Sequence, residues 1–291
     1  MIISHLIGGL GNQMFQYAAG RSLSAHLQVR HAIDIRDFGE YSLHNGFELG
    51  LFNFSVQLAS SDEIRSVLGV ASKPIIKKLL RREIFEFLRP NSFIVEPHFN
   101  FFSEFFSINP NSYLYGYWQS EKYFKCAEQL IRKDFSFKTP LIGKNKLISS
   151  QIANSNAVSV HIRRGDFVDD AKTRKIMSIC DLRYYEKAIA YISSKIDNAV
   201  FYVFSDDLNW ARQNIVFPHP CLFIDHNRNE NSHFDMHLMS LCKHHIIANS
   251  SFSWWGAWLN RSSDKIVVAP KCWFVNSNDD SDLIPCDWVR L

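Results

Sequence analysis

The stretch VSVHIRRGDF at residues 158–167 joins a strand pattern to two adjacent arginines. Its apolar residues alternate with more polar ones, as they do along a β-strand, and Gly165 ends the pattern. Arg163 and Arg164 therefore follow the carboxyl end of the strand. Ligands bind at this edge of open α/β sheets, and guanidinium groups suit phosphate oxygens. A surface arginine–aspartate ion pair is the alternative interpretation.

Short apolar runs and helical patterns alternate around this stretch, from about residue 151 to residue 291. This alternation is typical of a parallel sheet that is covered by helices on both faces. The expected strands are 157–162, 199–204, 221–224, 245–248 and 265–269. The expected helices are 182–195, 207–215, 234–243 and 252–260.

The beginning of the chain has a similar organisation. An apolar run, the Gly-rich turn GGLGN at 8–12, a helical pattern and a second run, VRHAIDI, predict the start of a doubly wound α/β domain. Residues 40–120 give no strand order. Helical patterns occur at 61–69, 73–89 and 121–133. We therefore predict an α/β protein with two Rossmann-like domains, residues 1–140 and 150–291.

Composition and charge limit the class of protein. The 291 residues are 46% hydrophobic, and the net charge of +3 is too small to indicate nucleic-acid binding. The N-terminus lacks the charged region of a signal peptide, and no apolar run reaches the roughly 18 residues that span a bilayer. The six cysteines form no CxxC pair, which favours reduced, mostly buried thiols. We expect a protein of the bacterial cytoplasm or of the cytoplasmic face of the inner membrane.

Two further loops carry polar residues directly after predicted strands. These residues are Asp206 and Asp207, and then Asn249, Ser250 and Ser251. Paired aspartates can orient an arginine or a ribose hydroxyl, and serines at a helix N-terminus can bind an anion. A helix N-cap is the alternative interpretation of both pairs. The usual companions of a metal-binding aspartate are absent, so we expect no metal site. Together the three loops would suit a diphosphate and its nucleoside.

The Gly-rich turn also allows a different function. Gly9 and Gly11 begin a GxGxxG pattern, which fails because Met14 occupies the place of the third glycine. Asp34 fits the acidic residue that binds a ribose in dinucleotide-binding proteins. An NAD-type oxidoreductase is therefore a competing hypothesis, although it leaves the paired arginines unexplained.

Three tryptophans in the stretch SSFSWWGAWL lie near helical spacing. We expect Trp254, Trp255 and Trp258 to pack in the core, because large aromatic residues are mostly buried. The alternative is that they stack on sugars, in which case the protein would be a non-catalytic glycan-binding module.

Five motifs together resemble the bacterial α-1,2-fucosyltransferases, in a superfamily with α-1,6- and protein O-fucosyltransferases. The motifs are GGLGNQMFQYA (8–18), GYWQSEKYF (116–124), HIRRGDF (161–167), FSDD (204–207) and ANSSFSWWGAWL (248–259). The resemblance implies the GT-B fold, in which two Rossmann-like domains enclose a cleft. It also implies inverting, metal-independent transfer of L-fucose from GDP-L-fucose to a galactose 2-hydroxyl, with no cofactor. Another GDP-sugar would also fit a guanine site.

The resemblance also implies roles for individual residues. Arg163 would bind the β-phosphate of GDP, and Arg164 would assist, tethered by Asp166 or by the Asp206–Asp207 pair. Asp166 is also a candidate general base, although a carboxylate that binds arginine is a poor base. His161 and Asp235 would contact guanine. The remaining donor-binding candidates are Gly9, Gly11, Asn12, Asn249, Ser250, Ser251 and Phe252. The acceptor candidates are Tyr117, Trp118 and Gln119.

The segment KPIIKKLLRREIFEFLR at 73–89 predicts a basic amphipathic helix. Its apolar face would contain Ile76, Leu80, Ile84 and Phe87, with lysines and arginines mostly elsewhere. Such a helix suits an anionic membrane surface. A helix that packs on the core and exposes a basic side is the alternative. The expected partners are thus GDP-fucose, a β-galactoside glycan that can be lipid-linked, and a membrane surface contacted through residues 73–89, with no nucleic acid.

Overall fold

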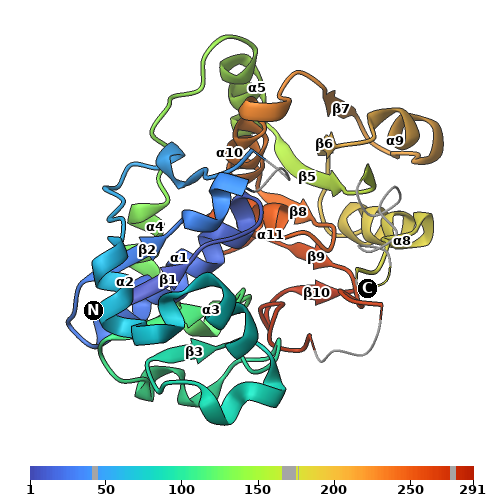
Figure 1. The fold of residues 1–291 in the computed structure, drawn as a ribbon. Helices are drawn as coiled ribbons and strands as arrows, with labels where there is room; N and C mark the ends of the chain where they lie inside the picture. Colours follow the sequence, from blue (N-terminus) through green and yellow to red (C-terminus); the bar gives the residue numbers. More distant parts are fainter. Residues whose placement is uncertain (41–44, 166–174, 176, 276–279) are drawn as a thin grey trace. The chain divides into compact units, whose positions relative to one another are not determined.

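The computed structural model describes residues 1–40, 45–165, 175, 177–275 and 280–291, which form two compact units (Figure 1). The N-terminal unit comprises Met1–Ser136 together with Ser281–Leu283. The C-terminal unit comprises Phe137–Asp280 and Ile284–Leu291. Each unit contains its own parallel sheet.

The N-terminal unit is built on a four-stranded parallel sheet. Its strands are β1 (Ile2–His5), β2 (His31–Asp34), β3 (Phe93–Val95) and β4 (Ser112–Tyr115), in the order β2-β1-β4-β3. The order reverses between β1 and β4. The loops after these two strands therefore leave the sheet at its switch point, where open α/β sheets bind ligands.

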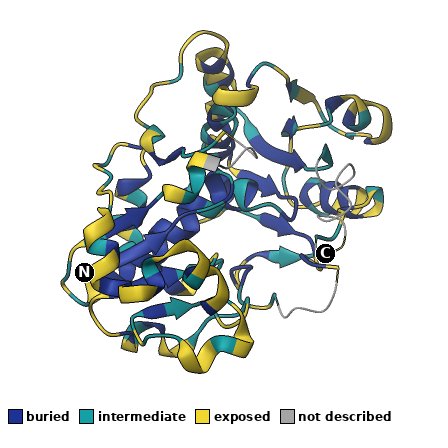
Figure 2. Ribbon diagram, in the orientation of Figure 1, coloured by how far each residue is buried: buried dark blue, intermediate teal, exposed yellow. Residues whose placement is uncertain are grey.

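The described residues of this unit form the α-helices α1 (Leu10–His26), α2 (Ser61–Leu68), α3 (Pro74–Leu80) and α4 (Glu128–Asp134). Helix α1 is buried along most of its length (dark blue in Figure 2), which explains its apolar and small residues on all sides. Helix α2 begins at a capping box, in which Ser60 and Glu63 each accept a backbone hydrogen bond from the other.

The C-terminal unit contains a six-stranded parallel sheet in the order β10-β9-β8-β5-β6-β7. Its strands are β5 (Asn156–Ile162), β6 (Ala199–Ser205), β7 (Cys221–Ile224), β8 (His244–Ile246), β9 (Val267–Ala269) and β10 (Val289–Arg290). This is the strand order of a Rossmann fold, and its switch point lies between β5 and β8.

Helices cover both faces of this sheet. They are α5 (Gly143–Ala153), α8 (Leu182–Ser193), α9 (Leu208–Asn214), α10 (His233–Leu241) and α11 (Ser251–Leu259). On one face Val158 and Val160 pack with α8, and on the other Ala157 packs with α5 and α10. The prediction of a parallel sheet that is covered on both faces is confirmed.

The structure differs from the sequence predictions in two details and adds strands that were not predicted. Segment 73–89 is not one helix, because α3 ends at Leu80 and a separate 3-10 helix spans Glu83–Leu88. Strands β3, β4 and β10 were not predicted. Cys180 and Cys242 are buried, but the other four cysteines are exposed; all six are free thiols. Among the described residues, the helices are all too short or too polar to cross a bilayer.

Candidate functional site

Three loops at the carboxyl edge of the C-terminal sheet carry the polar residues that the sequence singled out. They follow β5, β6 and β8, so two of them flank the switch point between β5 and β8. The residues in these loops are Arg163, Arg164, Asp206, Asp207, Asn249, Ser250 and Ser251. Asp166 and the rest of the chain up to residue 174 lie outside the described residues.

Asp206 fixes the turn that carries the two arginines. Its Oδ1 atom accepts a hydrogen bond from the backbone N–H of Arg164 (2.9 Å), and its Oδ2 atom accepts one from Gly165 (3.1 Å). The same Oδ2 atom lies 3.1 Å from Nη1 of Arg163. A Cβ atom at Gly165 would lie 3.0 Å from this carboxylate, so the contact favours glycine. Asp206 therefore orients the Arg163 guanidinium. This is one of the two functional roles that the sequence suggested for the paired aspartates, the other being to bind a ribose hydroxyl.

Arg164 is held by an aromatic ring that the sequence analysis missed. Its guanidinium carbon lies 3.9 Å from the centroid of the Trp210 ring, and its Nε atom lies 3.7 Å from Oδ2 of Asp207. Asp207 also caps α9, because its Oδ1 atom accepts the backbone N–H of Trp210 at 3.0 Å. The N-cap interpretation of Asp207 is thus confirmed. The sequence does contain a signal for Trp210. It lies three residues after Asp207, so an N-cap at Asp207 places Trp210 in the first turn of α9, close to the cap.

His161 is a buried, neutral imidazole beside the arginine loop. Burial, with a smaller contribution from the charge of Arg163, lowers the pKa of His161 to about 3. Its ring centroid lies 6.0 Å from that of Phe252. Its Nδ1 atom is buried and has no hydrogen-bond partner among the described residues. A buried polar atom without a partner is costly, so this atom is suited to a ligand hydrogen bond.

Helix α11 directs its N-terminus toward the same edge. Ser250 is its N-cap, with extended backbone angles, and within the described chain its side chain makes no capping hydrogen bond. The first N–H groups of a helix and its dipole favour an anion at this place. Trp254, Trp255 and Trp258 are buried, as predicted for core residues.

Asn249 does not offer its side chain to a ligand, which corrects its expected role. The residue is fully buried. Its Nδ2 atom donates hydrogen bonds to the backbone carbonyls of Ser178 and Trp273, the latter at 3.0 Å. Asn249 therefore connects the chain after β8 to two neighbouring segments, and its role is structural.

Asp235, in the first turn of α10, belongs to a polar network from three parts of the C-terminal unit. Its Oδ1 atom accepts a hydrogen bond from Asn227 (2.8 Å), which is paired with Asn145 of α5 through two amide hydrogen bonds of 2.9 Å. Burial, opposed by the Asn227 hydrogen bond, raises the pKa of Asp235 to about 7. Neither asparagine was predicted, because the network joins residues that are far apart in the sequence.

In the N-terminal unit, glutamine side chains tie the two switch-point loops together. Oε1 of Gln16 accepts the N–H of Ile7 (2.9 Å), and its Nε2 atom donates to the carbonyl of Gly116 (3.1 Å). Gln119 donates a second bond between the loops, to Oδ1 of Asn12, at 2.8 Å. The sequence analysis missed Gln16, although it lies in the quoted GGLGNQMFQYA motif.

The partly buried carboxylate of Glu96 shapes the GYWQ loop. Oε2 of Glu96 accepts the N–H of Tyr117 (2.6 Å), and Oε1 accepts the N–H of Trp118 (2.9 Å). A Cβ atom at Gly116 would lie 2.3 Å from Cβ of Glu96, so this position requires glycine. Burial raises the pKa of Glu96 to about 7, although the two N–H groups oppose this shift.

The acceptor candidates have different environments. Trp118 is 1% exposed, packs against Phe105 and Tyr123, and has a φ angle of +56°, so it does not fit the expected sugar contact. Tyr117 is 39% exposed and Gln119 is partly exposed. Gly9 and Gly11 lie at and just after the N-cap of α1. The binding roles of these residues remain predictions.

The model of the protein family described as glycosyl transferase family 11 matches residues 69–290. The chain belongs to this family. It is thus a glycosyltransferase, and the predicted resemblance is confirmed at the level of the family.

Two curated relatives are similar over almost the whole chain, and a solved structure is similar over most of it. The protein is 38% identical to the α-1,2-colitosyltransferase of Escherichia coli, in an alignment that covers 100% of this chain and 99% of the relative. It is 34% identical to the O-antigen biosynthesis glycosyltransferase WbnK of Escherichia coli, covering 99% of each chain. The structure of the NodZ α-1,6-fucosyltransferase of Bradyrhizobium, soaked with GDP-fucose, has a TM-score of 0.53, 15% identity, and coverage of 89% and 91%. This likeness confirms the GT-B-type fold.

The competing oxidoreductase hypothesis is contradicted by the position of Asp34 in this family 11 protein. Asp34 is 1% exposed, and its carboxylate accepts hydrogen bonds from the Arg36 side chain (2.9 Å each) and from the Tyr113 hydroxyl (2.7 Å). Burial opposes ionisation, but these donors lower the pKa of Asp34 overall. The carboxylate thus binds protein groups rather than a ribose.

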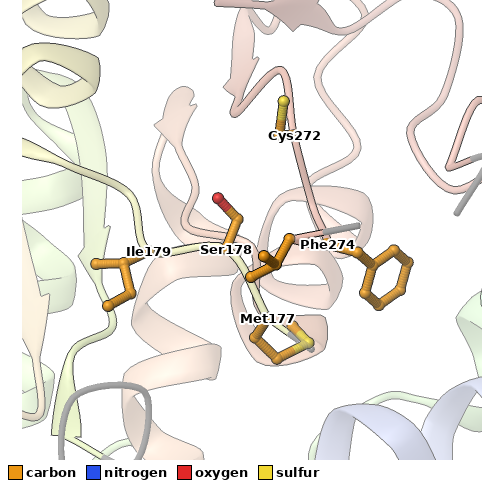
Figure 3. A pocket seen from close by; sticks show the side chains of 6 residues that line it. Met177, Ser178, Ile179, Cys272 and Phe274 are labelled. Carbon is orange, nitrogen blue, oxygen red and sulfur yellow. The ribbon is translucent and has the colours of Figure 1, made fainter. Parts of the chain in front are cut away.

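Two other features of the chain concern metal and ligand binding. Among the described residues, no group of three or more histidines, cysteines and carboxylates could hold a metal ion. A hollow of about 380 Å³ in the C-terminal unit is shown in Figure 3. Its lining residues are Met177, Ser178, Ile179, Cys272, Phe274 and Val275. This lining has no charged side chain, so the hollow does not suit a diphosphate.

Proposed function

We propose that this glycosyltransferase moves L-fucose from GDP-L-fucose to the 2-hydroxyl of a terminal β-galactose, with inversion at the anomeric carbon. The observation that carries the proposal is the Arg163 guanidinium, held 3.1 Å from Asp206 at the switch point of a Rossmann sheet. A fixed cation at this place is suited to the diphosphate of a nucleotide-sugar. The names of the relatives, an α-1,2-colitosyltransferase and an α-1,6-fucosyltransferase, support a deoxy-sugar donor, and the former supports a 2-linked product.

The charge of the loops accounts for the proposed chemistry. As the bond between fucose and GDP breaks, negative charge grows on the β-phosphate. Arg163 and the N-terminal N–H groups of α11 would stabilise this charge, and they are already in place before the reaction. Since stabilisation of the leaving group is strongest in the transition state, it increases the rate rather than only the affinity. We propose that these donors serve in place of a metal ion.

The nucleoside would be recognised by the groups that surround the arginine loop. Neutral His161 has an Nδ1 atom available for a hydrogen bond, and Phe252 lies beside its ring. Asp235 can accept hydrogen bonds, and guanine presents two donors, N1–H and the 2-amino group, that a carboxylate could accept together. We propose that these residues select guanine among nucleobases.

The sugar acceptor would be bound by the N-terminal unit. Its switch-point loops are tied together through Gln16 and Gln119, and they present Tyr117 to solvent. We propose that these loops receive a β-galactoside of a growing surface polysaccharide. The O-antigen role of the relative WbnK supports this substrate class, and it favours the cytoplasm or the cytoplasmic face of the inner membrane.

A second donor is supported by the 38% identity to a colitosyltransferase. Colitose is fucose without its 3-hydroxyl, so a site for either sugar needs the same GDP and methyl contacts. The alternative proposal is transfer of colitose from its GDP-sugar by the same groups.

The test is transfer from GDP-fucose and GDP-colitose, in parallel, to a panel of soluble β-galactosides, with the linkage determined by NMR. We expect a 2-linked fucosyl product, at a rate that EDTA does not change. Transfer from GDP-colitose alone would replace the first proposal with the second. No transfer from either donor to any β-galactoside, or activity that requires Mg²⁺ or Mn²⁺ after EDTA, would contradict both.

A further inference from the structure

Residues 70–88 of the N-terminal unit expose a group of large apolar side chains. Ile75 is 77% exposed, Ile84 is 72% exposed and Phe87 is 82% exposed. Val70, Leu79 and Leu88 are also exposed. The segment after α3 is accordingly yellow in Figure 2. Single exposed apolar residues are common, but six within nineteen residues indicate a surface that binds something. We call these six residues the apolar surface.

The apolar surface cannot turn inward, because the other side of α3 is fixed to the unit. Lys77 is 4% exposed, and its Nζ atom lies 3.9 Å from Asp34 and 3.7 Å from Asp37. Leu80 packs in the core of the unit. Since Ile75 and Leu79 are four residues apart, they share the helix face that points away from this anchor.

Arg81 holds the point where α3 ends. Its guanidinium lies 3.4 Å from Asp37 and 4.1 Å from the centroid of the Tyr115 ring. The backbone is extended at Arg82, and the 3-10 helix begins at Glu83. The chain therefore bends next to an anchored residue and carries Ile84 and Phe87 outward rather than along the predicted helix face.

Cations lie among the exposed apolar residues. Lys73, Lys78 and Arg82 are exposed, whereas Lys77 and Arg81 are paired with Asp37. The segment contains two acidic residues. Glu86 lies 3.5 Å from Arg89, so its charge is balanced, and Glu83 is the acidic residue that offsets the exposed cations. The solvent-facing charge around the apolar surface is therefore positive.

We propose that the apolar surface docks on an anionic lipid bilayer, with Ile75, Ile84 and Phe87 in the interfacial layer and the exposed cations at the lipid phosphates. Interfacial helices bind membranes through this combination of apolar area and positive charge. A second copy of the chain is a poorer occupant, because a two-fold contact would bring the three cations of each copy together. The proposal depends on the N-terminal unit alone and does not require the proposed donor or acceptor.

The test is co-sedimentation of the full-length protein with vesicles of phosphatidylcholine, alone or with a third of phosphatidylglycerol, at 50 and 300 mM NaCl. We expect binding to the anionic vesicles that weakens at high salt, because exposed charges are screened. The double variant Ile84→Ser/Phe87→Ser should lower the partition coefficient at least about tenfold, since burial of each apolar side chain in the interfacial layer adds to the affinity. Lys73→Glu/Lys78→Glu should remove the preference for anionic lipid.

Val216→Ser is the matched control, because Val216 is 86% exposed and lies in the other unit. It should bind vesicles like the wild type. All variants should retain turnover of a soluble acceptor, which separates loss of docking from loss of folding. Equal binding of wild type and Ile84→Ser/Phe87→Ser would overturn the proposal. So would self-association of the wild type that this double variant abolishes.

Discussion

The Asp206 carboxylate lies 3.1 Å from the Arg163 guanidinium and also accepts two backbone N–H groups of the same loop. One side chain thus sets both the direction of the arginine and the course of the backbone that carries it. Because Asp206 follows β6 and Arg163 follows β5, the register of two adjacent strands determines this geometry.

Replacement of Arg163 by alanine should lower kcat by about 100-fold or more, as loss of one transition-state donor does in other enzymes. Asp206→Asn should retain the loop hydrogen bond to one amide oxygen but weaken the hold on Arg163. We expect a fall in kcat of about 10- to 100-fold, which is typical of a misplaced catalytic group. Steady-state kinetics with varied donor concentration would measure both effects.

Asp62→Asn is the control for these variants, because Asp62 also pairs with an arginine, Arg65, but lies on the exposed surface of α2 in the N-terminal unit. It should have wild-type kcat. If Arg163→Ala also has near-normal turnover, the assignment of the leaving-group site is wrong.

Trp210 should matter for catalysis although it is not predicted to contact substrate. Stacking of a guanidinium on an aromatic ring contributes about 0.5–2 kcal/mol. Trp210→Leu should therefore lower kcat/KM by about 2- to 30-fold, and Trp210→Phe should restore much of the loss. Equal activity of the leucine and phenylalanine variants would show that only the volume of Trp210 matters.

Glu96 should make stability depend on pH in a defined direction. Burial raises its pKa in the folded protein to about 7, from an ordinary value of 4.5. The folded state therefore holds a proton between these two values that the unfolded state has lost. The contribution of Glu96 to the free energy of unfolding is greatest below about pH 4.5 and falls as the pH rises toward 7.

Chemical denaturation of the wild type and of Glu96→Gln at pH 5, 6, 7 and 8 would measure this effect. The wild-type free energy of unfolding minus that of the variant should decrease across this range, whatever their absolute difference. A constant difference would show that Glu96 is ionised throughout. Gly116→Ala, which places a methyl group against Glu96, should cost about 1–3 kcal/mol.

Asp235 gives a pH prediction for ligand binding. Its pKa of about 7 means that it becomes ionised as the pH rises from 6 to 8. A carboxylate accepts hydrogen bonds from guanine better than a carboxylic acid does, so GDP affinity should rise over this range. GDP affinity of the wild type and of Asp235→Asn would be measured by calorimetry. Titration of the phosphates of GDP affects both proteins equally, so it cancels in the ratio of the two affinities. A ratio that does not change with pH would place Asp235 outside the guanine site.

The sequence predicted the C-terminal unit well, because most of its strands are apolar runs that alternate with helical patterns. It predicted the N-terminal unit less completely. Strands β3 and β4 lie in residues 40–120, where apolar runs and helical patterns do not alternate regularly, and β10 has only two residues. The helix predicted at 73–89 ends at Leu80, next to Arg81, which contacts Asp37; amphipathic spacing does not reveal this contact.

Only some residues of the candidate site could likewise be predicted from the sequence. Arg163, Asp206 and Ser250 were predictable, since each follows a strand whose carboxyl end can be read from the sequence. Trp210 and Glu96 were not, because their importance depends on a partner from another segment. Asn249 follows a strand end in the same way as Ser250 but points into the interior, so strand position alone does not distinguish a ligand contact from a structural one.

The N-terminal unit includes a short segment from near the C-terminus, and this limits how the protein can be divided into fragments. Ser281–Leu283 belong to the N-terminal unit, where Asp282 accepts a hydrogen bond from the backbone of Phe101, and yet the next residues return to form β10. A fragment that stops at Ser136 would lack this partner of Phe101. A fragment that starts at Phe137 would contain Ser281–Leu283 without the unit to which they belong. Two fragments expressed separately and divided after Ser136 should therefore complement each other inefficiently.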